Sequence, residues 1–162
     1  MMSDNYSKEY EALKDAAENK HQDAILEKLG PLVGLSFKEK VAAFMGRVQF
    51  MELGLKGMLV RDYGYEDERV ENLSLGRLVG ELRNNEEGND LSRALLVLLK
   101  RLVNYRNYVA HNILVDDAMI RAITENDDAR HFAERELFHA MYCVEQTIRF
   151  HDHYLPMLKA EN

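Results

Sequence analysis

The chain has 162 residues, of which 46% are hydrophobic and 30% charged, so its composition is that of one globular domain and not of a disordered segment. A formal net charge of −7 repels nucleic acid overall, so any phosphate binding must depend on a local basic cluster. The single cysteine, Cys143, excludes an internal disulfide and a cysteine-based zinc site within one chain.

Residues 1–30 are predicted to form an N-terminal helical arm, and residues 31–162 the main helical domain. Within the arm, helical spacing of apolar residues predicts a helix over 3–29, which Gly30 and Pro31 end. The first residues are polar and acidic, unlike a secretory signal, and no apolar stretch approaches the roughly 20 residues that cross a bilayer. We therefore expect a cytoplasmic protein without a membrane partner.

A capping box and an apolar stripe predict a helix over residues 36–61. The Ser36 hydroxyl can accept a hydrogen bond from the first turn, and Glu39 can return one. The apolar residues that follow recur at alternating steps of four and three, which is typical of a bundle helix. They are Phe37, Val41, Phe44, Val48, Met51, Leu55 and Met58. The helix is expected to stop before Gly64.

A short helix over 73–82, capped by Ser74, is predicted next, followed by a polar loop over 84–90. Asp90 then caps a helix over 91–113, which carries two apolar stripes. One stripe is Leu91, Leu95, Leu98, Leu102, Tyr105 and Val109, and the other is Leu96, Leu99, Val103 and Ala110. Two stripes predict a central helix that packs on two sides.

The chain then turns at 115–117, where a short helix over 118–124 is conceivable, and ends in a long helix over 128–155. No stretch of useful length alternates in the manner of a β-strand. The sequence therefore predicts an all-α bundle of four to five helices, mostly antiparallel.

Three polar residues late in the 91–113 helix suit chemistry on a phosphodiester: Arg106, Asn107 and His111. Arginine presents a permanently charged planar fork to phosphate oxygens, and histidine, with an unperturbed pKa of about 6.5, exchanges protons near neutral pH. Asparagine can orient either group. On an ideal helix Arg106 and His111 point about 140° apart, with the small Ala110 between them, so the long arginine can reach across.

This element resembles the Arg-Asn-x-x-x-His element of HEPN domains, over roughly residues 36–155. The preceding Leu75-Gly76-Arg77-Leu78 segment also fits the family pattern. The resemblance implies a helical homodimer whose motif helices line a shared cleft. It further implies a metal-independent endoribonuclease or RNA-binding protein of toxin–antitoxin or defence type, with RNA and an antitoxin as possible partners and with no cofactor.

In that reading Arg106 binds and stabilises the phosphate, His111 transfers protons and Asn107 supports both. Position 113 is isoleucine where some HEPN toxins carry tyrosine, so regulation through that tyrosine is not expected. Flanking residues that point in nearly the same direction as His111 are predicted to bind RNA. They are Arg93, Lys100 and Asn104.

Two other interpretations stay open. Some HEPN domains are non-catalytic, and the acidic balance favours such an interaction or regulatory module. The other is a di-iron carboxylate enzyme, because Glu18-x-x-His21 and Glu136-x-x-His139 each place a carboxylate and an imidazole on one helical face. Glu52 is a conceivable further ligand, but a fourth carboxylate is not evident, and no metal site is predicted. His151 and His153 point about 200° apart, so they are not expected to chelate one ion.

Overall fold

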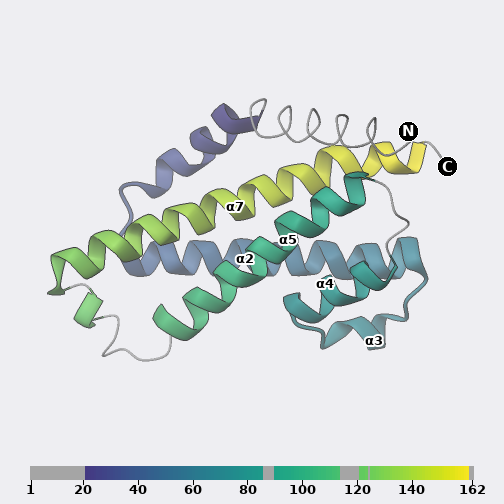
Figure 1. Ribbon diagram of the computed structural model, residues 1–162, viewed down its shortest axis with the longest axis horizontal. Helices are drawn as coiled ribbons and strands as arrows, with labels where there is room; N and C mark the ends of the chain where they lie inside the picture. Colours follow the sequence, from purple (N-terminus) through teal and green to yellow (C-terminus); the bar gives the residue numbers. More distant parts are fainter. Residues whose placement is uncertain (1–20, 86–89, 114–120, 124, 161–162) are drawn as a thin grey trace, which may run out of the picture.

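The computed structural model describes residues 21–85, 90–113, 121–123 and 125–160, and the regular structure in these ranges is helical throughout (Figure 1). A helix over 21–29 runs into a short 3₁₀-helix, η1 (Gly30–Leu32). The other elements are α2 (Phe37–Tyr63), α3 (Asp67–Glu71), α4 (Leu75–Asn84), α5 (Asp90–Tyr108), the π-helix η2 (Val109–Ile113) and α7 (Asp127–Ala160). The predicted all-α bundle is confirmed.

Helix α2 forms as its sequence predicts. The backbone N–H of Ser36 donates to Glu39 Oε2 at 2.8 Å, and the N–H of Glu39 donates to Ser36 Oγ at 3.3 Å, which completes the capping box. At the other end Gly64 takes a left-handed conformation with φ of 69°, which glycine adopts without steric cost. All seven residues of the predicted apolar stripe are buried.

Helix α4 follows Ser74, but the predicted serine cap is wrong: the Ser74 side chain makes no capping hydrogen bond. Glu52 of α2 takes its place, because its Oε1 accepts a hydrogen bond from Leu75 N at 3.1 Å. The short α3 was not predicted, since its five residues bury only Val70. Lys56 of α2 donates to the carbonyl of Glu71 at 2.6 Å and holds the end of α3.

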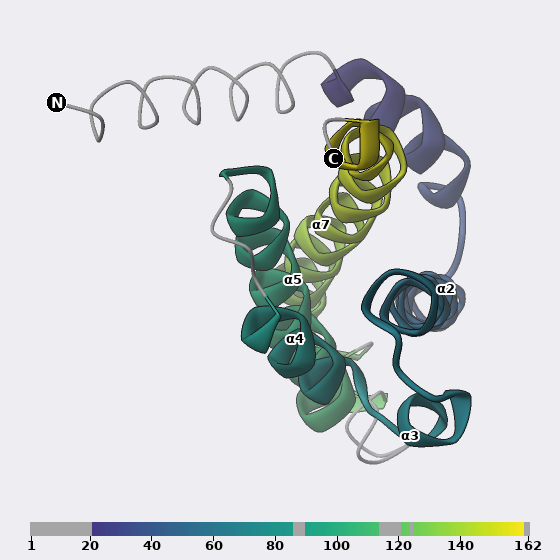
Figure 2. The ribbon, with the colours of Figure 1, turned by 90° about the vertical axis from the view of Figure 1, so that its right-hand side faces the viewer.

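Helix α5 packs against α7 on one side and against α4 on the other (Figure 2). In the first predicted stripe every described side chain except the half-buried Tyr105 is buried; in the second, Leu99 is buried and the others are half-buried. Figure 1 shows that α5 runs opposite to α2 and α7, whereas α2 and α7 run in the same direction.

The first described helix lies along α7 and belongs to the same core, because its Ile25 and Leu29 are buried there (Figure 1). A buried carboxylate joins three helices beside them. Glu145 of α7 is 2% exposed; Arg47 Nε of α2 lies 2.8 Å from its Oε1, and Lys28 Nζ lies 3.8 Å from its Oε2. Residues 1–20 of the predicted arm lie outside the described residues.

Helix α7 begins one residue before the predicted start and continues to Ala160. The predicted turn at 115–117 and most of the conceivable helix at 118–124 lie outside the described residues. Among the helices that are described, none combines the length and the apolar character that crossing a bilayer requires.

Candidate functional site

The predicted site lies where α5 changes its helical form. Helix α5 ends at Tyr108, and η2 continues the chain as one π-helical segment from Val109 to Ile113. The widened turn is accompanied by a side-chain contact, since Asn112 Nδ2 donates to the carbonyl of Tyr108 at 3.1 Å. Single π turns inside α-helices occur frequently at functional sites.

The π turn corrects the geometry expected for the motif. An ideal α-helix separates residues five apart by about 140°. A turn closed by i→i+5 hydrogen bonds holds more residues, so five residues come nearer to one full revolution. Because the π turn begins at Val109 and so covers the last part of the path from Arg106 to His111, the two residues diverge less around the helix than the ideal geometry predicts.

The side chains of the motif lie at the surface of α5. Arg106 is half-buried at the edge of the core, whereas Asn107 and His111 are exposed. The guanidinium of Arg106 turns toward the outward face and donates from Nη1 to Asn107 Oδ1 at 3.4 Å. His111 makes no hydrogen bond or ion pair with other described residues, and the predicted approach of Arg106 to its imidazole is not seen among them.

The three predicted flanking residues, Arg93, Lys100 and Asn104, are all exposed on α5. Lys100 and Asn104 line a groove of about 430 Å³ between α4 and α5. Arg83, in the last turn of α4, lines the same groove from the other side. Sequence reasoning missed Arg83, because only the packing of α4 against α5 brings it beside Lys100.

Two glycines of α4 open this groove. Gly76 and Gly80 line it, and a Cβ built at Gly76 would come to 3.8 Å from Val103 of α5, so the two helices lie close there. Val79 and Leu96 add apolar surface. A groove with two cationic side chains, one amide and apolar walls can hold a phosphate beside a base.

The local charge of this helix is opposite to that of the whole chain. From Leu91 to Ile113 there is no aspartate or glutamate, and four residues are arginine or lysine. The chain holds 28 acidic residues in 162, so a stretch of this length would on average contain about four of them. The helix that carries the motif is therefore locally basic in an acidic protein.

A second polar pocket, of about 350 Å³, lies on the α7 side of α5. Tyr105, His139 and Arg101 line it, and sequence reasoning did not connect these residues. Burial, aided by the charges of Cys143 and Glu136, raises the pKa of Tyr105, so its hydroxyl keeps its proton and can donate a hydrogen bond. The lining includes no residue of the predicted motif.

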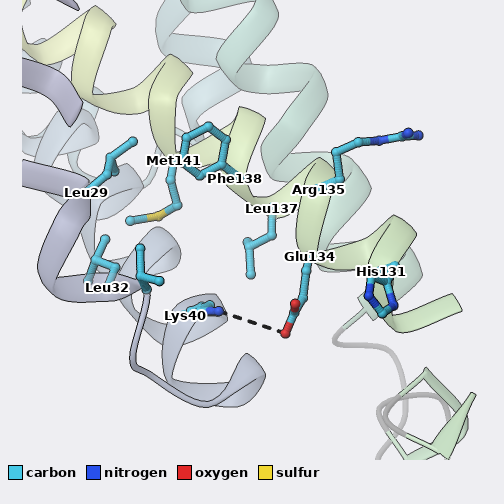
Figure 3. A pocket seen from close by; sticks show the side chains of 10 residues that line it. Leu29, Leu32, Lys40, His131, Glu134, Arg135, Leu137, Phe138 and Met141 are labelled. Carbon is cyan, nitrogen blue, oxygen red and sulfur yellow. Dashed lines mark ion pairs between the residues drawn. The ribbon is translucent and has the colours of Figure 1, made fainter. Parts of the chain in front are cut away.

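An apolar pocket of about 340 Å³ lies between η1, α2 and the first half of α7 (Figure 3). Leu29, Leu137 and Met141 form much of its wall, and an ion pair between Lys40 Nζ and Glu134 Oε1, 3.9 Å apart, bridges its edge. None of the described residues around it belongs to the predicted site. Its walls suit hydrocarbon and not phosphate.

Where they are described, the residues proposed for a di-iron site are not gathered at one place: Glu52 and His21 serve other contacts, and only His139 and Glu136 lie together. Glu52 caps α4, His21 stacks on His153 with ring centroids 5.0 Å apart, and His139 lies 4.0 Å from Glu136. Glu18 lies outside the described residues. Within the described ranges no group of three or more histidine, cysteine or carboxylate side chains is arranged to hold a metal ion.

His151 is partly buried against α2, where its Cε1 lies 3.7 Å from the position of a Cβ on Gly54. Its Nδ1 lies 3.1 Å from Asp152 Oδ1, and its Nε2 is buried without a hydrogen-bond partner in the described part of the chain. His153 stacks instead on His21, so the two histidines serve separate contacts.

Comparisons with protein-family models, with curated proteins and with solved structures found no match for this chain.

Proposed function

We propose that this chain is a HEPN-like protein that binds RNA on the outward face of α5 and cleaves it as a metal-independent endoribonuclease, in a toxin–antitoxin or defence setting. The observation that carries the proposal is the locally basic helix. It has four basic and no acidic residues from Leu91 to Ile113, with Arg106 hydrogen-bonded to Asn107 beside the exposed His111. Such a local basic face is what an acidic protein needs to bind RNA.

Each residue has a role that follows from its chemistry. The Arg106 guanidinium offers two parallel N–H donors to phosphate oxygens and stabilises negative charge that develops on the phosphoryl group. The RNA supplies the 2′-OH as nucleophile: its oxygen bonds to the adjacent phosphorus as the P–O5′ bond breaks, which leaves a 2′,3′-cyclic phosphate and a 5′-OH. His111 takes the proton from the 2′-OH or gives one to the leaving O5′. Asn107 holds Arg106 in position through its Oδ1. Lys100, Asn104 and Arg83 bind the neighbouring nucleotides in the groove between α4 and α5.

The resemblance to HEPN domains adds two expectations to this proposal. Two copies of α5 would line a shared cleft, so that Arg106 and His111 from both copies face one RNA. In a toxin–antitoxin setting an antitoxin would block this face. Both expectations place the partner on the outward side of α5, where Asn107 and His111 are exposed.

The test is cleavage of a labelled structured RNA in the presence of EDTA. Wild-type protein is expected to cleave, and Arg106→Ala and His111→Ala are each expected to remove activity by about 100-fold or more, the usual size of one electrostatic or proton-transfer contribution. His131→Ala and Arg135→Ala are matched controls, because both residues are exposed on α7. If all four variants cleave equally, the activity belongs to another site or to a contaminant.

One observation favours a second candidate, a non-catalytic module that binds RNA or a protein through the same face. A general base is normally oriented by a third group, and His111 has no such partner among the described residues. This module would show no cleavage by a folded protein, while binding would still weaken when Arg106 or Lys100 is replaced.

A further inference from the structure

The outward face of α2 carries no charge from position 42 to position 57, which is about four turns. Phe50 is 58% exposed and Leu53 is 67% exposed, which is unusual for two large apolar side chains on neighbouring turns. The exposed residues of α2 from position 42 to position 57 are Ala42, Gly46, Gln49, Phe50, Leu53 and Gly57. A helix face that is meant for water normally carries lysine and glutamate.

The charged residues in this part of α2 are directed toward the same chain. Arg47 binds the buried carboxylate of α7, Glu52 caps α4, and Lys56 donates to the last turn of α3. These are the three charged residues between Val41 and Val60. The outward face is therefore left to small and apolar residues and to one uncharged polar residue, Gln49.

The spacing on this face is symmetric about its midpoint. Gly46, Phe50, Leu53 and Gly57 lie within about 60° of one another on the helix and follow the order small, large, large, small. Reversing the direction of the helix leaves that order unchanged, with steps of four, three and four residues. A two-fold axis requires one patch to fit a reversed copy of itself, which is the property that this spacing has.

We infer that α2 is a pairing surface for a second copy of this chain, with the two α2 helices antiparallel and the two-fold axis beside Met51 and Glu52. Position 46 then lies opposite position 57, and position 50 opposite position 53. A Cβ built at Gly46 or Gly57 meets nothing within 4 Å, so each glycine leaves a hollow at the end of the ridge. Phe50 fits between the partner's Leu53 and the partner's Gly57.

The area of this face limits how strongly two copies can associate. The stretch from Ala42 to Val60 is about 28 Å long, and a helix is about 10 Å wide, so one copy contributes a few hundred Å². A standard stable interface covers about 800 Å² per partner. A reversible pair at micromolar concentration is therefore expected.

This surface is separate from the α5 site. Figure 2 shows α2 on one side of the bundle and α5 with α4 on the other. Pairing through α2 leaves the motif and its groove open, and it does not depend on whether α5 binds RNA or pairs in its own right.

Cysteine cross-linking of the full-length chain tests the geometry. Gly46→Cys and Gly57→Cys fit the open space at both positions, and the native Cys143 is buried. Antiparallel pairing predicts that a mixture of the two variants forms a disulfide between copies under mild oxidation. Neither variant alone should form a disulfide, because position 46 of one copy lies about 16 Å along the helix axis from position 46 of the other, and the same holds for position 57. Self-linking of either variant, or no link in the mixture, overturns the inference.

Light scattering across a micromolar concentration range supplies the second measurement. Phe50→Glu is expected to halve the mass of the associated species, because it places a charge in the centre of the pair. Phe132→Glu is the matched control, since Phe132 of α7 is 51% exposed and lies outside the surface. An associated mass that Phe50→Glu leaves unchanged, or a wild-type protein that stays monomeric throughout, contradicts the inference.

Discussion

Salt dependence measures how many cations of the α5 face contact RNA. Besides Arg101, which lines the pocket on the α7 side, four basic residues lie on α5 or across its groove: Arg83, Arg93, Lys100 and Arg106. Each phosphate contact to single-stranded nucleic acid contributes about −0.7 to the slope of log K against log salt, so four contacts predict a slope of about −2.8. Between about 50 and 200 mM salt the affinity should then fall about 50-fold.

The assay is fluorescence anisotropy of a labelled single-stranded RNA, with His111→Ala as the parent protein so that the RNA stays intact. Adding Lys100→Ala removes one contact and should reduce the slope to about −2.1, which is a fall of about 20-fold over the same range. Arg135→Ala, on α7, should leave the slope unchanged. A parent slope shallower than about −1, or a slope that Lys100→Ala does not alter, would refute the placement of RNA on this face.

Substitutions elsewhere test the packing that holds this face. Arg47→Ala leaves the Glu145 carboxylate buried beside only the distant Lys28, and it should lower the free energy of unfolding in urea by about 2–4 kcal/mol. Adding Glu145→Gln to this variant should restore part of the loss. A loss below about 1 kcal/mol contradicts the buried pair. Glu52→Ala should lower the free energy of unfolding by about 1 kcal/mol, because α4 loses its cap, whereas Ser74→Ala should change it by only about 0.3 kcal/mol. Equal losses would show that Ser74 also caps the helix. Burial raises the pKa of Cys143 to about 11, so at pH 8 its thiol stays protonated and should react with a thiol reagent only as the chain opens; immediate labelling of folded protein would show an accessible thiolate.

The sequence predicts this fold well where its signals are local. The capping box and the four-three stripe of α2 lie within one helix, and both appear in the structure where the spacing places them. Helix α3 has five residues, too few for a periodic pattern, and is held by Val70 and by a lysine from α2. The cap of α4 comes from Glu52, which lies 23 residues before the amide that it binds, so only the folded chain reveals it.

In the candidate site, too, the features that depend on one helix were predictable and those that depend on packing were not. Residue types and their spacing on one helix selected Arg106, Asn107 and His111, and helical geometry placed three flanking residues in nearly the same direction as His111. All of these residues are exposed except Arg106, which is half-buried. A wheel with constant rotation could not predict the π turn of η2, because that turn depends on how the end of α5 packs. Arg83 was missed because it comes from another helix.

The net charge of −7 is a weaker argument against RNA binding than it first appears. At physiological ionic strength the Debye length is about 8 Å, so an RNA on α5 experiences mainly the charges that lie nearest to it. On α5 the charges from Leu91 to Ile113 are all basic. Glu136 of α7 is close enough to raise the pKa of Tyr105, but the acidic clusters lie on α3 and at the start of α7. At about 0.01 M salt the Debye length rises to about 30 Å, and the acidic clusters then oppose the local field. RNA affinity should therefore stop rising at very low salt, which distinguishes a basic face on an acidic protein from a uniformly basic one.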